Sequence, residues 1–386
     1  MTALDSRPTT HGDVLEAVRD LAPAIAERAA EIEASRRVPP DLLARLTDAG
    51  CFRMLLPHSH GGAGGDLTSA MHVFEELARA DASVGWIVAL GASTWIDVAE
   101  LPRSTFDAMY PVGGDVVISG VFNPTGVAIP VAGGYQVNGR WSFASGCEHA
   151  HWLYGNCIDT STGEPQLRIA VFRPDEVEIE DTWFVSGLRG SGSHHFTAHD
   201  VVVPAERTFL AFADPVCLDE PLLRIPVPAT LALEFASVAI GVAQGALDDI
   251  VALATSKTPL LASATLAANP LFQFQLGEAD VKLRAARSLL YAEASAAWAA
   301  AASDDEFTPQ LRARLRSAAV WATDAATAVV DMAYRAGGGS SLYDESLLQR
   351  RLRDIRAISQ HFLVKPDTLT TVGAIIAGQE PELTVF

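Results

Sequence analysis

The sequence predicts an α+β protein with three parts, because the spacing of its apolar residues changes twice along the chain. Apolar residues recur at helical spacing in the first part, alternate with polar residues in the middle, and return to helical spacing afterwards. Pro111 and the pair Gly113-Gly114 mark the first change. We therefore predict an N-terminal α-helical domain over residues 1–115, a central β domain over residues 116–210, and a C-terminal helical domain over residues 211–386.

The composition indicates a globular protein that binds neither nucleic acid nor an anionic membrane. The chain has 386 residues, of which 49% are hydrophobic and 19% are charged, and this is ample for a buried core. The formal net charge is −19, the isoelectric point is about 4.8, and the basic residues form no block. Such a charge repels nucleic-acid phosphates and anionic lipids.

Cysteine usage and the start of the chain predict a cytoplasmic protein. The four cysteines have no metal-type spacing, and we expect them to be buried thiols in a reducing compartment. They are Cys51, Cys147, Cys157 and Cys217. Met1–Asp5 is polar and lacks the apolar core of a signal peptide. The longest apolar stretch, from Ile225 to Leu247, is interrupted by prolines and by Glu234, so no membrane span is expected.

The N-terminal part is expected to consist of helices. Between residues 13 and 50 the apolar residues recur every three to four positions, and Pro39-Pro40 begins a second helix. The apolar face of the first helix is formed by Val14, Val18, Leu21, Ile25, Ala29 and Ile32. We expect Cys51–Pro57 to be extended, His58–Gly65 to be a loop, and Leu67–Leu90 to be helical.

The middle of the chain predicts strands, since five short segments alternate apolar and polar residues between Gly, Pro, Asn and Asp. These segments are Val116–Ser119, Tyr135–Phe143, Trp152–Ile158, Ile169–Arg173 and Val201–Val203.

A hairpin is predicted within the second of these segments. The triplet Val137-Asn138-Gly139 would form its turn, with Gly139 left-handed, and this would place Tyr135 and Trp141 on one face. After the hairpin, Ala144-Ser145-Gly146 forms a ledge of small residues. Their backbone groups can approach a flat ligand closely because little side chain intervenes.

Long antiparallel helices are expected in the last part of the chain. Apolar residues return to helical spacing over Pro228–Ala302 and Pro309–Ala336, with alanine-rich faces that permit close packing. Gly337-Gly338-Gly339 would end the second helical segment, and a helix with a basic face is expected over Leu347–Phe362. The acidic chain end is expected to lack regular structure.

Three motifs in the predicted β domain resemble those of the acyl-CoA dehydrogenase superfamily. They are Phe122–Gly126 (FNPTG), Gly139–Gly146 (GRWSFASG) and Trp183–Ser193 (WFVSGLRGSGS). Together with the order of the three parts, the resemblance covers nearly the whole chain. It implies an acyl-CoA dehydrogenase-like fold with an N-terminal helical domain, a central β-barrel domain and a C-terminal four-helix bundle.

Within this superfamily the chain is most similar to the oxygenase components of two-component flavin-dependent monooxygenases, through FNPTG, GRWSFASGCEHAHW and the segment Arg350–His361. Members of that group include hydroxyphenylacetate hydroxylase, the hydroxylase of steroid A-ring breakdown, dibenzothiophene monooxygenase and the sugar nitrososynthases. The resemblance implies a homotetramer that takes FMNH2 or FADH2 from a separate NAD(P)H-dependent flavin reductase. Its reaction with O2 would give a C4a-hydroperoxide, which hydroxylates or oxidises a small aromatic or polycyclic substrate in a dry pocket.

Other functions remain open at the level of the sequence. An acyl-CoA dehydrogenase would hold FAD tightly and use Glu234 as its base, because Glu234 matches the position of the base in isovaleryl-type enzymes. A nitrososynthase-type enzyme would oxidise nitrogen, and a member without activity would only bind flavin or a partner. Thr265–Gln273 lacks the Arg that holds the FAD pyrophosphate in the dehydrogenases, which favours a flavin that is borrowed, whether FMN or FAD.

The resemblance also implies the residues of the site. His361 lies close to where dehydrogenases carry a catalytic Glu, so it would act beside the flavin, unless it only fastens the end of its helix. Ser145 and His149 would be the other catalytic residues. The flavin contacts would be Phe122, Asn123, Thr125, Phe143, Ala144, Ser145, Arg189, Gly337 and Gly338. The substrate contacts would be Trp86, Cys147, His149 and Glu234.

Three of the residues near the ledge are expected to point the same way. In an extended segment Cys147, His149 and His151 would share one face, although His151 can equally well cap a strand end. No metal site is expected, because the histidines of this region form no convincing set of ligands.

Overall fold

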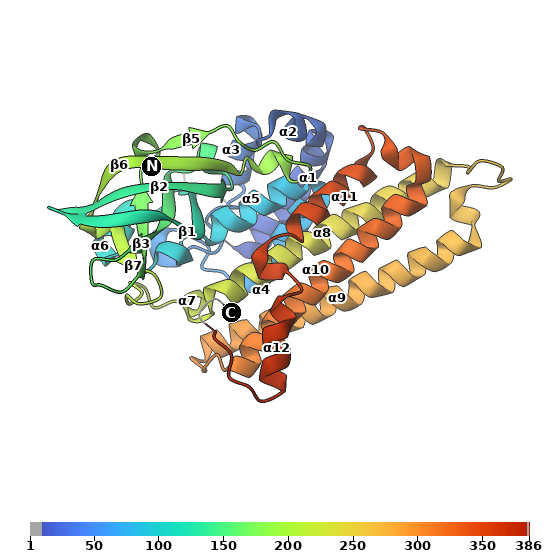
Figure 1. Ribbon diagram of the computed structural model, residues 1–386. Helices are drawn as coiled ribbons and strands as arrows, with labels where there is room; N and C mark the ends of the chain where they lie inside the picture. Colours follow the sequence, from blue (N-terminus) through green and yellow to red (C-terminus); the bar gives the residue numbers. More distant parts are fainter. Residues whose placement is uncertain (1–9, 384–385) are drawn as a thin grey trace, which may run out of the picture.

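The computed structural model describes residues 10–383 and 386 and shows a sheet on one side, long helices on the other, and shorter helices between them (Figure 1). The polar stretch Met1–Asp5 lies outside the described residues.

The N-terminal part is helical, as predicted. Its helices are α1 (His11–Glu27), α2 (Ala29–Ser35), α3 (Pro40–Asp48), α4 (Leu67–Ala80), α5 (Ala82–Ser93) and α6 (Arg103–Met109), with 3₁₀ turns η1 (His58–His60) and η2 (Ile96–Val98). The prediction of an extended Cys51–Pro57 is wrong, because this segment forms buried turns. The Asp81 carboxylate accepts the N–H groups of Ser83 and Val84 and starts α5. Helix α5 is buried on nearly all sides because it lies between the sheet and the long helices (Figure 1).

The central part is one seven-stranded mixed sheet with the order β5-β6-β2-β1-β3-β4-β7. The strands are β1 (Ile118–Val131), β2 (Gly134–Ala144), β3 (Trp152–Asp159), β4 (Gln166–Phe172), β5 (Glu178–Glu180), β6 (His194–Pro204) and β7 (Thr208–Leu210). Strands β1 and β3 are parallel, and the other pairs are antiparallel. The expected β-barrel is not closed, since β5 and β7 lie at opposite edges of the sheet.

The predicted hairpin turn at Val137-Asn138-Gly139 is wrong. These residues lie in the middle of β2, where Asn138 pairs with Val127 of β1 and Gly139 pairs with Ala198 of β6. The turn instead follows Val131, and Gly133 there has a φ of 83°, which glycine adopts without strain. The register between β2 and β6 shifts after Val137, so the Asn-Gly pair marks an irregularity within a strand.

The core of the sheet is built around Trp141. Its indole N–H donates to the carbonyl oxygen of Asn156 at 2.8 Å, and its ring stacks on Phe196 with the centroids 4.9 Å apart. Tyr135 packs against the same core, so the prediction that Tyr135 and Trp141 share a face is confirmed. Gly155 on β3 lies against the indole so closely that an added Cβ would meet its Cε2 at 2.3 Å.

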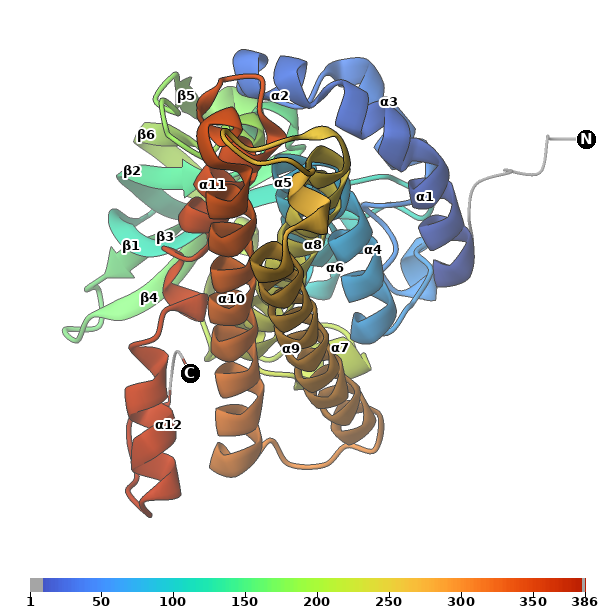
Figure 2. The same cartoon turned by 90° about the vertical axis from the view of Figure 1, so that its right-hand side faces the viewer.

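The C-terminal part is helical, as predicted, with two differences. It contains α7 (Pro221–Arg224), α8 (Val227–Ser256), α9 (Pro270–Ala302), α10 (Pro309–Gly337), α11 (Leu347–Ile358) and α12 (Thr368–Ile376), with 3₁₀ turns η7 (Leu266–Ala268), η8 (Gly338–Leu342) and η9 (Phe362–Val364). Residues 257–269 interrupt the predicted segment Pro228–Ala302, and α12 forms where no helix was expected. Figure 2 shows α9 and α10 side by side, with α12 beside α10.

Helix α8 is, within the described part of the chain, the one helix long and apolar enough to cross a membrane. In the structure 94% of its most apolar window is buried inside the protein. It packs against α4, α5, α9, α10 and α11, and this explains its apolar surface without a membrane.

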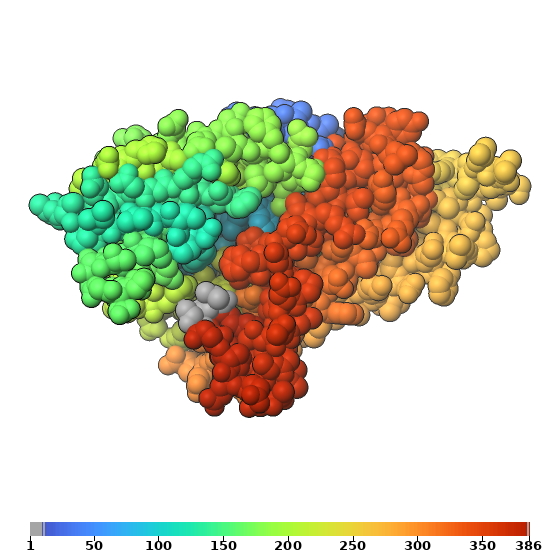
Figure 3. Space-filling model, in the orientation of Figure 1, coloured from blue at the N-terminus to red at the C-terminus, as the bar shows by residue number. Residues whose placement is uncertain are grey.

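A groove separates the sheet from the C-terminal helices. In Figure 3 the surface is hollowed between the strands, drawn in green, and the segment around α11, drawn in red, with atoms of the N-terminal helices at its floor. The carboxyl end of β2, with the predicted ledge, adjoins helices from the other two parts through the contacts described below.

Replacing Gly155 by Ala should destabilise the sheet, because the new methyl group would overlap the Trp141 ring. Overpacking of this kind costs about 1–3 kcal/mol of unfolding free energy. Urea unfolding followed by fluorescence measures the loss. Gly277→Ala on exposed α9, where nothing lies within 4 Å of the added Cβ, is the control and should be neutral or stabilising by up to about 1 kcal/mol. Equal effects of the two substitutions would contradict the packing around Trp141.

Candidate active site

The ledge at the end of β2 has an unusual backbone. Phe143 has a φ of 72° and Gly146 a φ of 71°, so the chain turns sharply on both sides of Ala144 and Ser145. The N–H of Ser145 donates to the carbonyl oxygen of Phe143 at 3.0 Å, and the N–H of Gly146 donates to the carbonyl oxygen of Ser191 at 2.9 Å. The Phe143 ring is left 67% exposed by this turn. The ledge therefore has a half-buried Ser145 between the buried Ala144 and Gly146, next to one exposed aromatic ring.

Three aromatic side chains from separate elements meet beside the ledge. Trp86 of α5 stacks on Phe235 of α8, with ring centroids 4.4 Å apart and an interplanar angle of 26°. The His361 ring, which follows α11, stands edge-on to both, at 4.6 Å from Phe235 and 5.6 Å from Trp86. We define Trp86, Phe235 and His361 as the aromatic cluster. Because Trp86 and Phe235 are buried, aromatic rings border this side of the ledge.

His361 is neutral in this environment. Burial first, and then the positive charges of Arg316 and Lys365, lower the pKa of its imidazole to about 4. Its Nδ1 accepts the N–H of Leu363 at 3.3 Å, and this hydrogen bond assigns the proton to Nε2. His361 therefore caps η9, and its other ring nitrogen is an Nε2–H donor within the aromatic cluster.

A row of hydroxyl groups supports the ledge from behind. The indole N–H of Trp86 donates to Ser145 Oγ at 3.1 Å, and Ser145 Oγ lies 2.7 Å from Ser193 Oγ. Ser193 Oγ in turn lies 2.7 Å from Ser191 Oγ, whose hydroxyl donates to the carbonyl oxygen of Leu188 at 2.8 Å. We call Ser145, Ser193 and Ser191 the serine row. It connects the aromatic cluster to the turn η5 (Arg189–Ser191).

Glu234 lies behind the aromatic cluster and is fully buried. Burial raises the pKa of its carboxyl well above the usual value, despite a hydrogen bond with Ser93 at 2.9 Å. Ser93 Oγ also lies 2.8 Å from the carbonyl oxygen of Ala89, so a protonated Glu234 can donate to the Ser93 hydroxyl while that hydroxyl donates to Ala89. Burial thus disfavours the ionised form of Glu234, which is the form that a proton-abstracting base needs.

Asp97 is a second buried acid in this region. Burial raises the pKa of its carboxyl to about 7, and Tyr154 donates to it at 2.8 Å. Its charge, if present, would raise the pKa of Glu234 further.

The residues after the ledge do not share one face, and the prediction of an extended segment there is wrong. Cys147, Glu148 and His149 form the 3₁₀ turn η3 (Cys147–His149). The Cys147 thiol is buried and donates to the carbonyl oxygen of Gly192 at 3.6 Å, and burial raises its pKa to about 12. This orientation argues against Cys147 as a substrate contact.

The two histidines of this region differ from each other. Burial lowers the pKa of His149 to about 4, and its ring lies against Phe52 with the centroids 6.3 Å apart. His151 instead accepts the backbone N–H of Val117 at 3.1 Å, which matches the strand-capping interpretation.

The FNPTG motif forms part of β1 and is not a loop. Phe122 is half-buried and stands edge-on to Tyr154 at 5.9 Å. Asn123 and Thr125 are exposed, and the Thr125 hydroxyl donates to the carbonyl oxygen of Arg140 at 2.6 Å.

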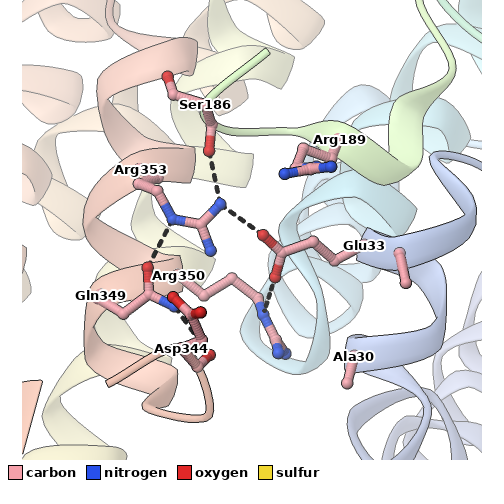
Figure 4. Close-up of a pocket in the computed structure, with 9 residues that line it drawn as sticks. Ala30, Glu33, Ser186, Arg189, Asp344, Gln349, Arg350 and Arg353 are labelled. Carbon is pink, nitrogen blue, oxygen red and sulfur yellow. Dashed lines mark hydrogen bonds and ion pairs between the residues drawn. The ribbon is translucent and has the colours of Figure 1, made fainter. Parts of the chain in front are cut away.

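Arg189 lies in a separate pocket of about 550 Å³ between α2, α11 and the segment before η5 (Figure 4). Arg353 and Arg350 both pair with Glu33, at 2.5 Å and 2.8 Å, and Arg353 also donates to the carbonyl oxygen of Ser186. Among the described residues, the buried Nε of Arg189 has no hydrogen-bond partner. The pocket therefore offers an uncommitted guanidinium in a chain that is otherwise strongly acidic.

The predicted glycine turn also lies apart from the ledge. Gly337 ends α10, and Gly338, with a φ of 54°, begins η8. Lys257 donates to the carbonyl oxygen of Gly337 and to Ser340 Oγ. The side chain of Lys257 therefore already stabilises this turn.

The structure brings His361, Trp86 and Ser145 together, whereas Arg189, Gly337 and Gly338 lie elsewhere. Sequence reasoning did not single out Phe235, Ser191 or Ser193. The two serines belong to the WFVSGLRGSGS motif, but its letters do not show that their hydroxyls form a row with Ser145. Phe235 follows Glu234 and gave no separate signal.

Comparison with known proteins shows which families the chain resembles. The family described as acyl-CoA dehydrogenase, N-terminal domain, matches residues 8–99, and acyl-CoA dehydrogenase, C-terminal domain, matches residues 233–366. Indole-3-acetate monooxygenase of Pseudomonas putida is 31% identical over 382 residues, which cover 98% of this chain and 96% of the relative. The FADH2-dependent resorcinol hydroxylase, oxygenase component, of a Rhizobium species is 28% identical and covers 92% and 91%.

Solved structures agree with these relatives. The crystal structure of 3-HSA hydroxylase from Rhodococcus sp. RHA1 superimposes with a TM-score of 0.90 at 28% identity, covering 97% of this chain and 99% of that one. The fold is therefore that of the acyl-CoA dehydrogenases, with helical N- and C-terminal parts around a mixed sheet. Within that superfamily the chain belongs to the flavin-dependent monooxygenases, in the group of oxygenase components.

The lowered pKa values of His361 and His149 predict that stability falls in acid. An unfolded histidine binds its proton near pH 6.5, whereas the folded ones bind it near pH 4. Between these values the unfolded state holds more protons, so the free energy of unfolding should rise with pH from 4 to 6.5 and then level off. His361→Gln should remove on the order of 1–2 kcal/mol of this rise, allowing for the partial exposure of the ring.

Urea unfolding at a series of pH values measures this slope. His199→Gln, at an exposed position, is the matched control and should keep the wild-type slope. A His361→Gln slope equal to that of the wild type would contradict the buried neutral state of His361.

Proposed function

We propose that this protein is the oxygenase component of a two-component monooxygenase. It takes reduced flavin, as FMNH2 or FADH2, from an NAD(P)H-dependent flavin reductase and uses O2 to oxidise a small organic substrate. The relatives are named for indole-3-acetate and resorcinol, both small aromatic compounds, so an aromatic or polycyclic substrate is proposed here as well. The observation that carries the proposal is the meeting of neutral His361, Trp86 and Ser145 at the ledge.

The residues present fit a flavin ring. Ser145 is half-buried at the ledge, the Phe143 ring stands exposed beside it, and Ser145 Oγ keeps a lone pair free after its two hydrogen bonds. Bound reduced flavin supplies the two electrons that activate O2, so that one oxygen atom enters the substrate and the other leaves as water.

The chain's own groups create the conditions for this chemistry. The aromatic cluster keeps water from one side of the ledge, and this protects the reaction of a bound flavin with O2 from water and stray protons. His361 keeps its proton on Nε2, where it donates a hydrogen bond to an oxygen atom of the reacting species. Because its pKa is about 4, His361 stays neutral and adds no charge to the site near neutral pH.

The remaining assignments follow from the same proposal. We assign His149, whose ring lies at the far end of the ledge, and Trp86 to the substrate side. The further flavin contacts proposed are Phe122, Asn123 and Thr125 on β1, Arg189 at the phosphate end, and Gly337 and Gly338. The free Arg189 guanidinium supports an anion contact, since a guanidinium pairs well with phosphate.

The assembly proposed is a homotetramer of chains with three domains, residues 1–115, 116–210 and 211–386, in which α8, α9, α10 and α11 form a four-helix bundle. Helix α9 supports it, because an exposed apolar stripe lies opposite its buried face. The stripe consists of Leu271, Phe274, Val281 and Leu289. A cytoplasmic location is proposed because all four cysteines are free thiols.

Oxygenation is tested by mixing the purified protein with photoreduced FMN or FADH2, a panel of phenols and indoles, and ¹⁸O₂. The product should gain one ¹⁸O atom, seen by mass spectrometry. If reduced flavin is oxidised with hydrogen peroxide as the sole product, and no substrate of the panel is oxygenated, the proposal is contradicted. Bleaching of a tightly bound flavin by an acyl-CoA under argon would favour the dehydrogenase instead.

His361→Ala should lower product formation by about 100-fold, because a positioned hydrogen-bond donor and proton-transfer group is lost. Hydrogen peroxide should rise in compensation, as measured by a peroxidase assay. Gln360→Ala, at the exposed neighbouring position, is the control and should leave the product yield unchanged. An unchanged yield in His361→Ala would remove its catalytic assignment.

Phe274→Asp should break the oligomer, because a charge in an apolar interface is costly to desolvate. Light scattering should give the mass of four 41.0 kDa chains for the wild type and a smaller mass for the variant. Asp280→Ser on the same helix lies outside the stripe and should keep the wild-type mass. A wild-type monomer would refute the proposed assembly.

A further inference from the structure

The serine row has a direction, because each hydroxyl carries a single proton. At one end the Trp86 indole can only donate, so Ser145 Oγ accepts. At the other end Ser191 lies 2.8 Å from the carbonyl oxygen of Leu188, which can only accept. The proton of Ser191 is therefore used on Leu188.

This fixes the two links in between. Since the Ser191 hydroxyl already donates its proton to Leu188, the Ser193 hydroxyl must donate to Ser191 Oγ, 2.7 Å away. Since the Ser193 hydroxyl then donates its proton to Ser191, the Ser145 hydroxyl must donate to Ser193 Oγ, 2.7 Å away. The reverse order would leave the oxygens of Ser191 and Leu188 2.8 Å apart with no proton between them, a close contact of two acceptors.

Ser145 is consequently an acceptor towards any ligand on the ledge. It receives the N–H of Trp86, gives its proton to Ser193, and has one lone pair left. The burial of Ser191 and Ser193, which are 1% and 2% exposed, shields the row from water that could supply other partners.

Reduced and oxidised flavin differ in what they offer such an acceptor. The central ring of reduced flavin carries an N–H at N5, whereas the same nitrogen in oxidised flavin has only a lone pair. If Ser145 can only accept, it can form a hydrogen bond with the N5–H of reduced flavin. It cannot form one with N5 of oxidised flavin, because both atoms then present lone pairs.

We infer that Ser191 and Ser193 are positioning residues that hold Ser145 as an acceptor, so that the ledge selects reduced flavin over oxidised flavin. The inference rests on the proposed function. It gives the chain a way to take up reduced flavin from a reductase and to release the oxidised form after turnover, with no change in the conformation of the ledge.

The test measures the dissociation constants of oxidised flavin in air and of reduced flavin under argon, by fluorescence and absorbance titration. The wild type should bind the reduced form at least about 10-fold more tightly. In Ser193→Ala the Ser145 proton is released and can turn towards the flavin nitrogen, so the affinity for oxidised flavin should rise and the preference should shrink by about 10-fold. Ser191→Ala should act in the same direction, because Ser193 can then donate to Ser145.

Two control variants distinguish an effect of the hydrogen-bond direction in the serine row from an effect of altered packing. Ser119→Ala removes a hydroxyl that donates to the backbone oxygen of Ser145 at 2.9 Å but takes no part in the row, and it should keep the wild-type preference. Ser193→Thr retains the hydroxyl and should restore the preference lost in Ser193→Ala. Circular dichroism identifies a variant that fails to fold, and Ser191→Ala then carries the test.

Two different failures are distinguishable. If the wild type binds neither form of flavin, the proposed function is wrong. If it binds flavin and oxygenates a substrate, but Ser193→Ala and Ser191→Ala both keep the wild-type preference within twofold, the serine row does not set the selectivity and this inference is overturned.

Discussion

The indole of Trp86 contacts all three parts of the chain, and the site depends on it. Its ring stacks on Phe235 of the C-terminal part and meets the edge of His361, while its N–H donates to Ser145 at the end of the sheet. Trp86 itself belongs to α5, which is buried between the sheet and the long helices. A single side chain thus sets the distance between a strand end, a core helix and the turn after α11.

Burial shifts three titratable groups of this region towards their neutral forms. His361 has its pKa lowered to about 4, Glu234 has its pKa raised well above the usual value, and Asp97 titrates near 7. All three shifts have the same first cause, the loss of water around the group, and all favour the neutral form. The ledge is therefore bordered by aromatic rings, a neutral histidine and hydroxyls, an environment of low polarity that suits chemistry which water would interrupt.

Much of the architecture could be predicted from local sequence patterns. The change from helical to alternating spacing predicted the three parts, because burial of one face imposes its own period. Helices α8 and α10 begin at or next to the predicted Pro228 and Pro309, whereas the start of α9 at Pro270 was not predicted. The prediction of a turn at Asn138-Gly139 was wrong because the surrounding sheet decides the backbone there. Asn-Gly favours a turn in isolation, but in this chain both residues are flanked by β1 and β6 and their backbone groups are taken up by the sheet.

By itself the sequence determined the order of the elements, the small-residue ledge at Ala144–Gly146, and the candidates His361, Trp86 and Ser145, since motifs and periodicity are properties of neighbouring residues. Only the tertiary structure decided that these three meet, that Arg189 lies in another pocket, and that Ser191 and Ser193 stand in line behind Ser145. Packing also decided the protonation states, because the pKa of His361 or Glu234 depends on how much water the fold removes from around it. Contacts between residues more than a hundred positions apart, such as Trp86 with Phe235, leave no trace in local spacing.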